Sequence, residues 1–310
     1  MTFAAPGYAI RSVRPCSETC AAEGPALAAP GVALPRRPGE ARDSTRPVSP
    51  KGLSMGDPLA TVATLGALGL GAVVGSFVNV VVSRLPRGES LAFPRSRCPF
   101  CSSPIRWHDN VPLLSYLWLR GRCRDCDARI PLRYPVVETV MAALFAFTGW
   151  QVGWKPDLIP LLFLLSALVA ITAIDLEHQL IPDRITLPGI AVGFSSALLI
   201  HRVSWVESLA GILLGGGILF AIIVLSGGGM GGGDMKLGAM IGAFLGWKLA
   251  LLGLLVSVLL GGVFAIILLS LRLRGRKDPV PFGPFLAAGA VVGLFWGEGI
   301  LKWYLAGFGG

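Results

Sequence analysis

The chain has 310 residues, of which 53% are hydrophobic and only 15% are charged, with a formal net charge of +9. This composition excludes an intrinsically disordered chain and disfavours a soluble enzyme. The positive charge does not indicate a nucleic-acid partner, because the arginines cluster between apolar segments, where basic residues set the topology of a membrane protein. Several apolar runs approach the roughly 20 residues that span a bilayer. The expected fold class is therefore an all-α polytopic membrane protein.

Residues 1–54 differ from the rest of the chain, because they are rich in Pro, Ala and Arg. They contain no apolar core of roughly 7–15 residues, so they do not have the pattern of a secretory signal peptide. We expect either a disordered extension or an over-long gene start, with Met55 as the true first residue. We assign no role to Cys16 and Cys20.

The rest of the chain divides into a first span within 55–82, a basic loop over 83–135 and a helical bundle over 136–310. The run from Leu237 to Leu271 is too long for one span, so we divide it near Trp247 and Lys248. The eight predicted membrane helices are about 59–82, 136–152, 158–174, 185–200, 206–225, 236–247, 249–271 and 284–305.

Basic residues predict the orientation of these helices. The loop 83–134 carries ten arginines against four acidic residues, and the loop 272–278 carries three arginines and a lysine. Both loops are expected in the cytoplasm, with both termini on the opposite side. The same count places the loops 175–184 and 226–236 on the cytoplasmic side as well.

Two CxxC pairs lie in the basic loop, Cys98 with Cys101 and Cys123 with Cys126, separated by 21 residues. Four thiolates at this spacing match a tetrahedral zinc site, and four protein ligands leave no position for a catalytic water. The expected zinc is therefore structural and holds together a lobe too small to form its own core. A redox dithiol is the competing interpretation, which the presence of two pairs in a cytoplasmic loop disfavours.

Two aspartates stand out among the apolar segments. Asp175 ends the apolar run 161–174, and Asp234 follows a glycine run in the sequence Gly231-Gly-Gly233-Asp234-Met-Lys236. Ionisable groups at membrane depth are costly and usually functional, and a carboxylate pair suits acid–base hydrolysis. The glycines let a substrate backbone approach Asp234. Lys236 either extends toward the interface or tunes the charge on Asp234.

Other polar residues near these segments have simpler interpretations. Asp183, after Pro182, is expected to be a helix N-cap rather than a catalyst. Glu177 and His178 are expected to be solvated loop residues, and Glu138 an interfacial residue near Arg133. The sequence contains no HExxH motif, so a zinc protease of that type is disfavoured.

From about Met55 onward the chain resembles the bacterial type IV prepilin peptidases, which are leader peptidases and N-methyltransferases. Four signatures carry this resemblance. They are Gly75-Ser-Phe-Val-Asn79 with Arg84-Leu-Pro86, the cysteine loop with Trp107–Tyr116, Leu119–Cys123 and Arg133-Tyr-Pro135, Asp175 with Ile181-Pro-Asp183, and the GxGD segment ending at Lys236.

The resemblance implies an aspartic endopeptidase of the bacterial inner membrane that removes the basic leader of type IV prepilins and pseudopilins at the cytoplasmic face. Asp175 and Asp234 match the catalytic pair of the family. Family members with the cysteine loop also methylate the new N terminus with S-adenosylmethionine, although no glycine fingerprint here locates that cofactor. The sequence assigns no oligomeric state.

Two rival functions belong to other classes. One is a transporter in which glycine breaks line the path and the aspartates relay protons, which predicts internal repeats that the chain lacks. The other is a methyltransferase or scaffold without protease activity. Substitution of either aspartate separates them, because only a peptidase would lose cleavage outright.

Overall fold

The computed structural model describes residues 58–93, 96–227, 230–271 and 281–308. The expected disordered segment 1–54, Cys16 and Cys20, and the basic loop 272–278 lie outside the described residues. The long helices are α1 (Pro58–Arg84), α3 (Arg133–Val152), α4 (Leu158–His178), α5 (Asp183–Leu199), α6 (Trp205–Leu225), α7 (Gly232–Ser270) and α8 (Gly283–Phe308). Three short helices lie between α1 and α3: η1 (Leu85–Arg87), η2 (Trp107–Asn110) and α2 (Leu114–Trp118).

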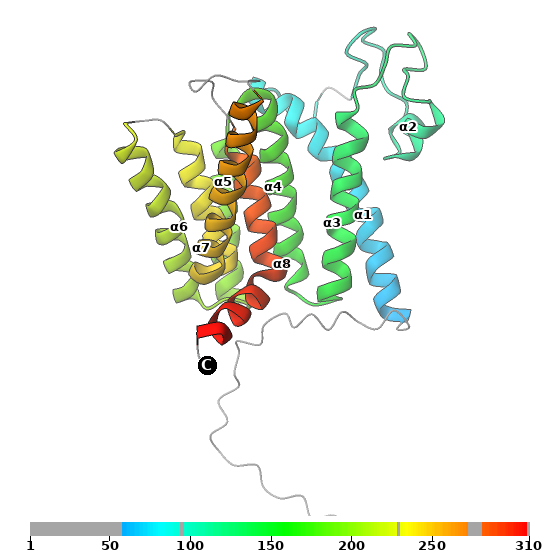
Figure 1. The fold of residues 1–310 in the computed structure, drawn as a ribbon. Coiled ribbons are helices and arrows are strands. Elements are labelled where there is room, and N and C mark those ends of the chain that lie inside the picture. Colours follow the sequence, from blue (N-terminus) through cyan, green and yellow to red (C-terminus); the bar gives the residue numbers. More distant parts are fainter. Residues whose placement is uncertain (1–57, 94–95, 228–229, 272–280, 309–310) are drawn as a thin grey trace, which may run out of the picture. The chain divides into compact units, whose positions relative to one another are not determined.

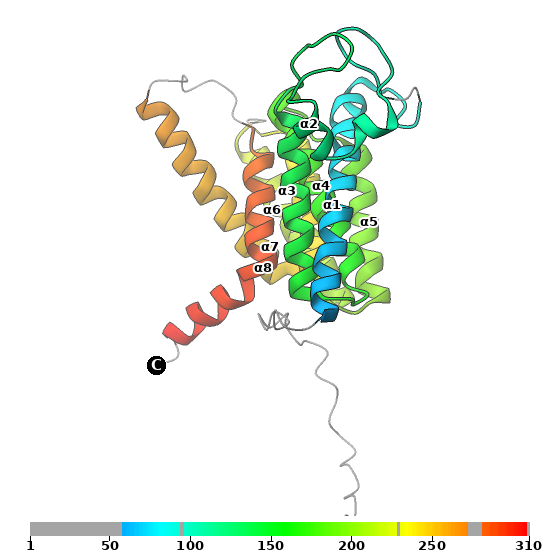
Figure 2. The ribbon, with the colours of Figure 1, turned by 90° about the vertical axis from the view of Figure 1, so that its right-hand side faces the viewer.

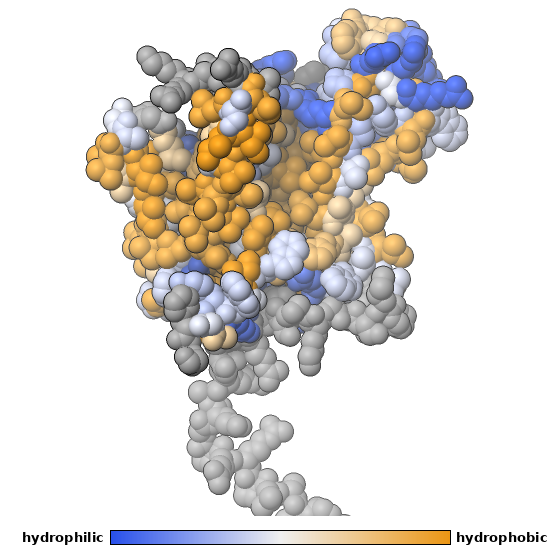
Figure 3. All heavy atoms as spheres, viewed as in Figure 1, coloured by the Kyte–Doolittle hydropathy of each residue, from blue (hydrophilic) through white to orange (hydrophobic). Residues whose placement is uncertain are grey.

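The all-α polytopic architecture expected from the sequence is confirmed. Within the described residues, six helices are long and apolar enough to cross a membrane, namely all of the long helices except α5. Helix α5 has 17 residues. Apolar side chains cover the outer faces of the helices in the view of Figure 3, whereas hydrophilic residues gather on the loop region above α1 and α3. This distribution is that of a bundle exposed to lipid, with one polar lobe outside it.

Helix α7 consists of two helical segments that meet at Gly246, whose φ of 73° and ψ of 171° are not helical. Its first half packs against α6 in antiparallel fashion, with Gly242 against Gly211 and Gly238 against Gly215. These glycines are required because a Cβ at Gly242 would lie 2.0 Å from the carbonyl oxygen of Gly211.

The second half of α7 runs in the opposite direction, back toward the end at which the helix began. It packs against α8 with Leu249 near Gly293, Gly253 against Gly289, and Gly261 near Phe285. The reversal at Gly246 lies next to the predicted division near Trp247. Counted as two segments, α7 brings the described long helices to the eight that the sequence predicts.

Helix α4 lies at the centre of the bundle and packs against α1, α3, α5, α7 and α8. Many of its apolar side chains, among them Leu164, Leu168 and Ile171, are fully buried in the core. The end of α4, the starts of α5 and α7 and the start of α8 meet at one end of the bundle, where α3 also begins (Figures 1 and 2). All the sequence-predicted site residues lie toward this end.

Candidate active site and cysteine lobe

Asp175 lies in the last turn of α4, and its side chain is buried, with a residue exposure of 5%. Its Oδ2 atom accepts a hydrogen bond of 2.9 Å from the backbone N–H of Gly283, the first residue of α8. The first N–H groups of a helix have no partner within the helix, so the carboxylate satisfies one of them and is itself oriented. A Cβ at Gly283 would lie only 2.6 Å from this oxygen.

Asp234 lies in the first turn of α7 and is also buried, with an exposure of 8%. Its Oδ1 atom has no hydrogen-bond partner among the described residues. The start of α7 packs against the α4–α5 loop that follows Asp175, which brings the Asp234 carboxyl group near that of Asp175. The structure thus brings together two carboxyl groups that are separated by two helices in the sequence, and leaves one oxygen unpaired.

The two glycines of the GxGD segment have different surroundings. A Cβ at Gly233 would lie 2.7 Å from the Cβ of Ile181, so Gly233 lets α7 begin against the α4–α5 loop. A Cβ at Gly231 would have only the Asp234 Oδ2 atom at 3.6 Å and a backbone nitrogen at 4.0 Å. Gly231 therefore leaves the space beside the Asp234 carboxylate open.

Lys236 forms an ion pair with Asp183, at 2.6 Å between Nζ and Oδ2. Asp183 is the first residue of α5, and the N-cap is Pro182, which corrects the expectation that Asp183 caps the helix. The side chain of Lys236 is thus directed to the start of α5. This contact joins the first turns of α5 and α7 on the rim of the site.

Glu177 and His178 are solvent-exposed, as expected, but they form the end of α4 rather than part of a loop. The Glu177 carboxylate accepts a hydrogen bond of 2.6 Å from Arg133. Arg133 is the first residue of α3. The contact links the aspartate end of α4 with the helix that follows the cysteine loop. Its partners are 44 residues apart in sequence, so no local pattern reveals it.

The two CxxC pairs form similar turns. In the first, Cys98 N–H donates to Ser103 O at 3.0 Å and Ser102 N–H donates to Cys98 O at 2.9 Å. In the second, Cys123 N–H donates to Ala128 O at 2.8 Å and Asp127 N–H donates to Cys123 O at 3.0 Å. The two turns face each other and place all four Sγ atoms within 4.8 Å of one another.

This geometry fits a metal ion. A tetrahedral zinc site with Zn–S bonds of about 2.3 Å holds its sulfurs about 3.8 Å apart, and the Cys98 and Cys126 Sγ atoms are 3.8 Å apart. Hydrogen bonds from Ser103 lower the pKa of Cys101 to about 6. Backbone N–H groups of Cys126 and Asp125 lower the pKa of Cys123. Both shifts favour the thiolate, which is the form that binds metals. Burial and hydrogen bonds to the other three thiols instead raise the pKa of Cys126 to about 12, so the fit to a metal rests on the sulfur spacing.

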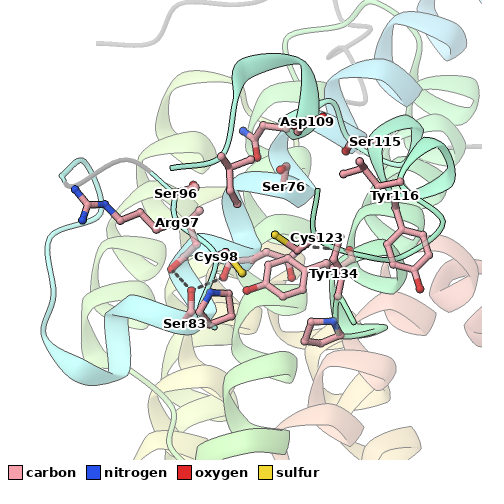
Figure 4. A pocket seen from close by; sticks show the side chains of 18 of the residues that line it. Ser76, Ser83, Ser96, Arg97, Cys98, Asp109, Ser115, Tyr116, Cys123 and Tyr134 are labelled. Atoms are coloured by element: carbon pink, nitrogen blue, oxygen red, sulfur yellow. Dashed lines mark hydrogen bonds between the residues drawn. The ribbon is translucent and has the colours of Figure 1, made fainter. Parts of the chain in front are cut away.

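A cavity of about 790 Å³ lies between this lobe and the helices α1 and α3. Figure 4 shows Cys98 and Cys123 from the lobe, Ser76 and Ser83 from α1, and Tyr134 from α3 around it. The sequence predicted zinc ligands in this loop but no small-molecule site between the loop and the helices. Glu138, expected at the interface near Arg133, is instead 7% exposed and lines this cavity.

Comparison with known proteins finds two family models that match successive parts of the chain. Residues 70–152 match the bacterial peptidase A24 N-terminal domain, and residues 162–266 match the type IV leader peptidase family. The prepilin leader peptidase/N-methyltransferase of Aeromonas hydrophila is 40% identical over 267 residues, which cover 76% of this chain and 91% of the relative. This chain belongs to the type IV leader peptidase family.

Other relatives have the same name. The protein of Pseudomonas aeruginosa is 37% identical over 281 residues, or 81% of this chain and 96% of the relative. That of Bacillus subtilis is 35% identical over 235 residues, or 76% of this chain and 95% of the relative. No solved structure matches the chain significantly. With its membrane-competent helices, this leader peptidase family member is a multi-pass protein of the bacterial inner membrane.

Of the sequence-predicted residues, the structure thus unites Asp175 with Asp234, and groups the four cysteines. The structure also identifies Gly283 as a hydrogen-bond donor to Asp175, which the sequence analysis missed. The available signal was the Pro-Phe-Gly-Pro segment 281–284, in which a glycine sits between prolines at the start of an apolar run. Prolines there mark a helix start, and the glycine marks a close approach.

Proposed function

We propose that this chain is an aspartic endopeptidase that removes the leader from type IV prepilins and pseudopilins, with Asp175 and Asp234 as the catalytic pair. The observation that carries the proposal is the meeting of two buried carboxyl groups from α4 and α7 at one end of the bundle. Two such groups cannot easily both ionise, so they share a proton and act as one acid–base unit.

The arrangement supports the hydrolysis step as follows. The ionised aspartate takes a proton from a water molecule, and the protonated aspartate donates its proton to the carbonyl oxygen of the scissile peptide. The Gly283 N–H holds the Asp175 carboxyl in place. The unpaired Oδ1 of Asp234 is available to water or substrate, and the open space beside Gly231 gives room for a peptide backbone.

We place this site on the cytoplasmic side. The loop 83–134, with ten arginines, leaves α1 and enters α3 at the end of the bundle that holds both aspartates. Basic residues accumulate on the cytoplasmic side of membrane proteins. A leader with positive charge would meet the dyad from the same side.

The second activity is methylation of the newly exposed N-terminal amine, with S-adenosylmethionine as the methyl donor. It is supported by the match of residues 70–152 to the bacterial peptidase A24 N-terminal domain and by the relatives, which are named prepilin leader peptidase/N-methyltransferase. We assign zinc to the four cysteines, in a structural role, because the sulfur spacing suits a closed tetrahedral site.

Co-expression with a type IV prepilin tests both activities by mass spectrometry of the pilin. Leader removal is expected with the native chain and absent with Asp175→Ala or Asp234→Ala. The mass increase of one methyl group on the processed pilin reports the second activity. Intact prepilin beside a well-inserted native enzyme would contradict the proposed peptidase function, and full cleavage by either variant would contradict the dyad.

A further inference from the structure

The cavity between α1, α3 and the cysteine lobe is lined by two buried acceptor side chains, Glu138 without an ion-pair partner among the described residues and Asn79 with an unpaired amide oxygen. Its volume of about 790 Å³ is within the range of roughly 300–1,000 Å³ found for small-molecule sites. The lobe closes it on one side, with Cys98 and Cys123 among the lining residues (Figure 4). The peptidase dyad is not part of its lining.

The first acceptor is the Glu138 carboxylate on α3. It accepts a hydrogen bond of 2.8 Å from the Leu113 N–H, and the Ser76 side chain lies within hydrogen-bonding range. The ion pairs found in the described part of the chain do not include Glu138. A buried carboxylate without a cation is costly, so Glu138 is a site where a positive ligand would be strongly favoured.

The second acceptor is Asn79 on α1, which is only 1% exposed. Its Nδ2 group donates to the Tyr134 carbonyl oxygen at 3.1 Å, so the orientation of the amide is set. The Oδ1 atom then has no hydrogen-bond partner within the described residues. Buried amide oxygens are nearly always paired, so this atom indicates a missing donor.

The two acceptors lie on facing sides of α1 and α3. Ser76 and Asn79 are three residues apart on α1, and Tyr134 and Glu138 are four apart on α3, so each pair spans about one helical turn. Gly75 permits this close packing, since a Cβ there would lie 2.8 Å from the Glu138 Cα. The contacts Ser76–Glu138 and Asn79–Tyr134 place the two acceptors at neighbouring turns of the α1–α3 interface.

The loop residue that contacts Glu138 has an unusual backbone. Leu113 has φ 61° and ψ −48°, a conformation that non-glycine residues rarely adopt. Strained residues of this kind concentrate at functional sites, where the surrounding structure holds them. Here the strain directs the Leu113 N–H at Glu138 and anchors the loop over the cavity.

We propose that Glu138 and Asn79 bind a primary ammonium group in this cavity and that the cavity is the site of methyl transfer. An ammonium supplies both the positive charge that Glu138 lacks and an N–H donor for Asn79 Oδ1. Two sources have this chemistry, the N-terminal ammonium of the cleaved pilin and the amino-acid ammonium of the methyl donor. This inference rests on the proposed methyltransferase function.

The reaction balances without a redox partner. The ammonium releases one proton to water, the neutral amine nitrogen forms a bond to the methyl carbon, and the sulfur–methyl bond of the sulfonium donor breaks with its electron pair left on sulfur, so the products are an N-methylammonium group and a neutral thioether. Glu138 would hold the amine in the closed cavity and compensate the charge of its ammonium form. The chain thereby supplies position and electrostatic compensation for the transfer.

The cavity is connected to the peptidase site through direct contacts. Glu177, two residues after Asp175, pairs with Arg133, and the next residue, Tyr134, bonds Asn79 in the cavity wall. One contiguous set of contacts therefore joins the dyad end of α4 to the proposed ammonium site. Both sites therefore lie at the same end of the bundle, so a pilin held there can present its new N terminus to the second site after cleavage at the first.

The test uses the full chain with Glu138→Gln, which removes the charge but keeps an acceptor for the Leu113 N–H. Glu298→Gln, on α8 and paired only with Lys302 among the described residues, is the matched control. Three quantities are measured: leader cleavage, methylation of a peptide with the processed pilin N terminus, and the thermal unfolding midpoint. We expect Glu138→Gln to slow methylation about 10- to 100-fold, with cleavage and unfolding unchanged.

Two binding measurements distinguish the pilin from the methyl donor as the source of the ammonium group. If the pilin supplies it, Glu138→Gln weakens binding of the free-amine peptide to the level of its acetylated form and leaves S-adenosylmethionine affinity unchanged. If the donor supplies it, the variant loses affinity for S-adenosylmethionine and S-adenosylhomocysteine alike. Ultraviolet cross-linking of labelled S-adenosylmethionine to the native chain should label segments 73–84 or 134–138.

Several results would overturn the assignment. These are native methylation rates in Glu138→Gln, a parallel loss of cleavage, methylation and unfolding temperature, or cross-links confined to α5–α8. If the native enzyme cleaves prepilin but neither methylates nor binds the donor, the methyltransferase function itself fails, and the ammonium site fails with it. If the native enzyme methylates a precut peptide but does not cleave, only the peptidase function fails.

Discussion

The dyad end of the bundle and the cysteine lobe position their functional groups by different physical means. Asp175 and Asp234 sit on long helices whose packing is set by buried apolar side chains and close glycine contacts. The lobe has only short helices, and its apolar residues Phe100, Trp107 and Trp118 are largely exposed. A segment that buries so little apolar surface depends on another constraint to hold its shape.

That constraint is the thiolate cluster. Each CxxC turn is closed by its own backbone hydrogen bonds, and the two turns meet at the sulfurs. Arg124 in the second turn also donates two hydrogen bonds to Asp109, which lies between the turns in sequence. A metal ion bound by the four sulfurs would join the turns and contribute folding free energy directly. The two sites should therefore fail separately. Damage to helix packing should affect the dyad, whereas loss of the metal should affect the lobe and the cavity that it closes.

The largest effect on leader cleavage is expected from substitutions of the dyad, that is, of Asp175 and Asp234. Asp175→Asn and Asp234→Asn should each lower leader cleavage by at least about 10²- to 10⁴-fold, because each removes one half of the acid–base unit. The double variant should be no worse than either single one, since the groups act together. The measurement is the rate of leader removal, with membrane insertion checked by fractionation. Methylation of a precut peptide should persist, and its loss in both variants would contradict the separation of the two sites.

Gly283→Ala should have the next largest effect. The new Cβ would lie 2.6 Å from Asp175 Oδ2, so the carboxylate or the start of α8 must move. A displacement of about 1 Å at a reacting group can reduce the rate about 100-fold. Gly299→Ala is the matched control, because it lies on the same helix with nothing within 4 Å of a Cβ. Equal cleavage rates in the two variants would show that the Gly283 contact does not position Asp175.

Cys123→Ser tests whether the cysteine lobe depends on a bound metal. One equivalent of zinc is expected per native chain, and the variant should lose it and become sensitive to proteolysis in the lobe. Methylation should fall by at least about 10-fold while most leader cleavage remains, since the dyad helices pack independently. Asp127→Asn is the control in the same turn, because it changes only an exposed ion pair with Arg122. Metal analysis that finds no zinc in the native protein would refute the assignment.

The sequence predicted the helices well and singled out the two aspartates that the structure brings to one end of the bundle, and the physical reason is the same for both. Membrane spans require long apolar runs, so eight of them are visible, and a carboxyl group such as Asp175 stands out against them. The division of the run 237–271 followed from length alone, and the reversal at Gly246 lies beside the predicted point.

What the sequence could not show depends on contacts between distant segments. Gly283 lies 108 residues from Asp175, and nothing local indicates which carboxylate its N–H meets. The sequence predicted Glu138 at the membrane interface. Its burial beside Gly75 results from the packing of α1 on α3, which no local pattern indicates. Single-sequence patterns report the face that a residue occupies, not its partner across the fold.

The smallest effect is expected at the rim of the dyad, where Lys236 and Asp183 form their ion pair. Both side chains are partly exposed, at 31% and 53%, so the pair contributes about 0.2–1 kcal/mol to stability. If Lys236 acts through Asp183, then Lys236→Met and Asp183→Asn should each reduce cleavage less than about 5-fold, and the double variant should equal the single ones. If Lys236 instead tunes the charge on Asp234, only Lys236→Met should shift the pH profile of cleavage. A double-variant cycle on the cleavage rate, measured across pH, distinguishes these outcomes, and additive effects would show that the ion pair does not couple α5 to α7.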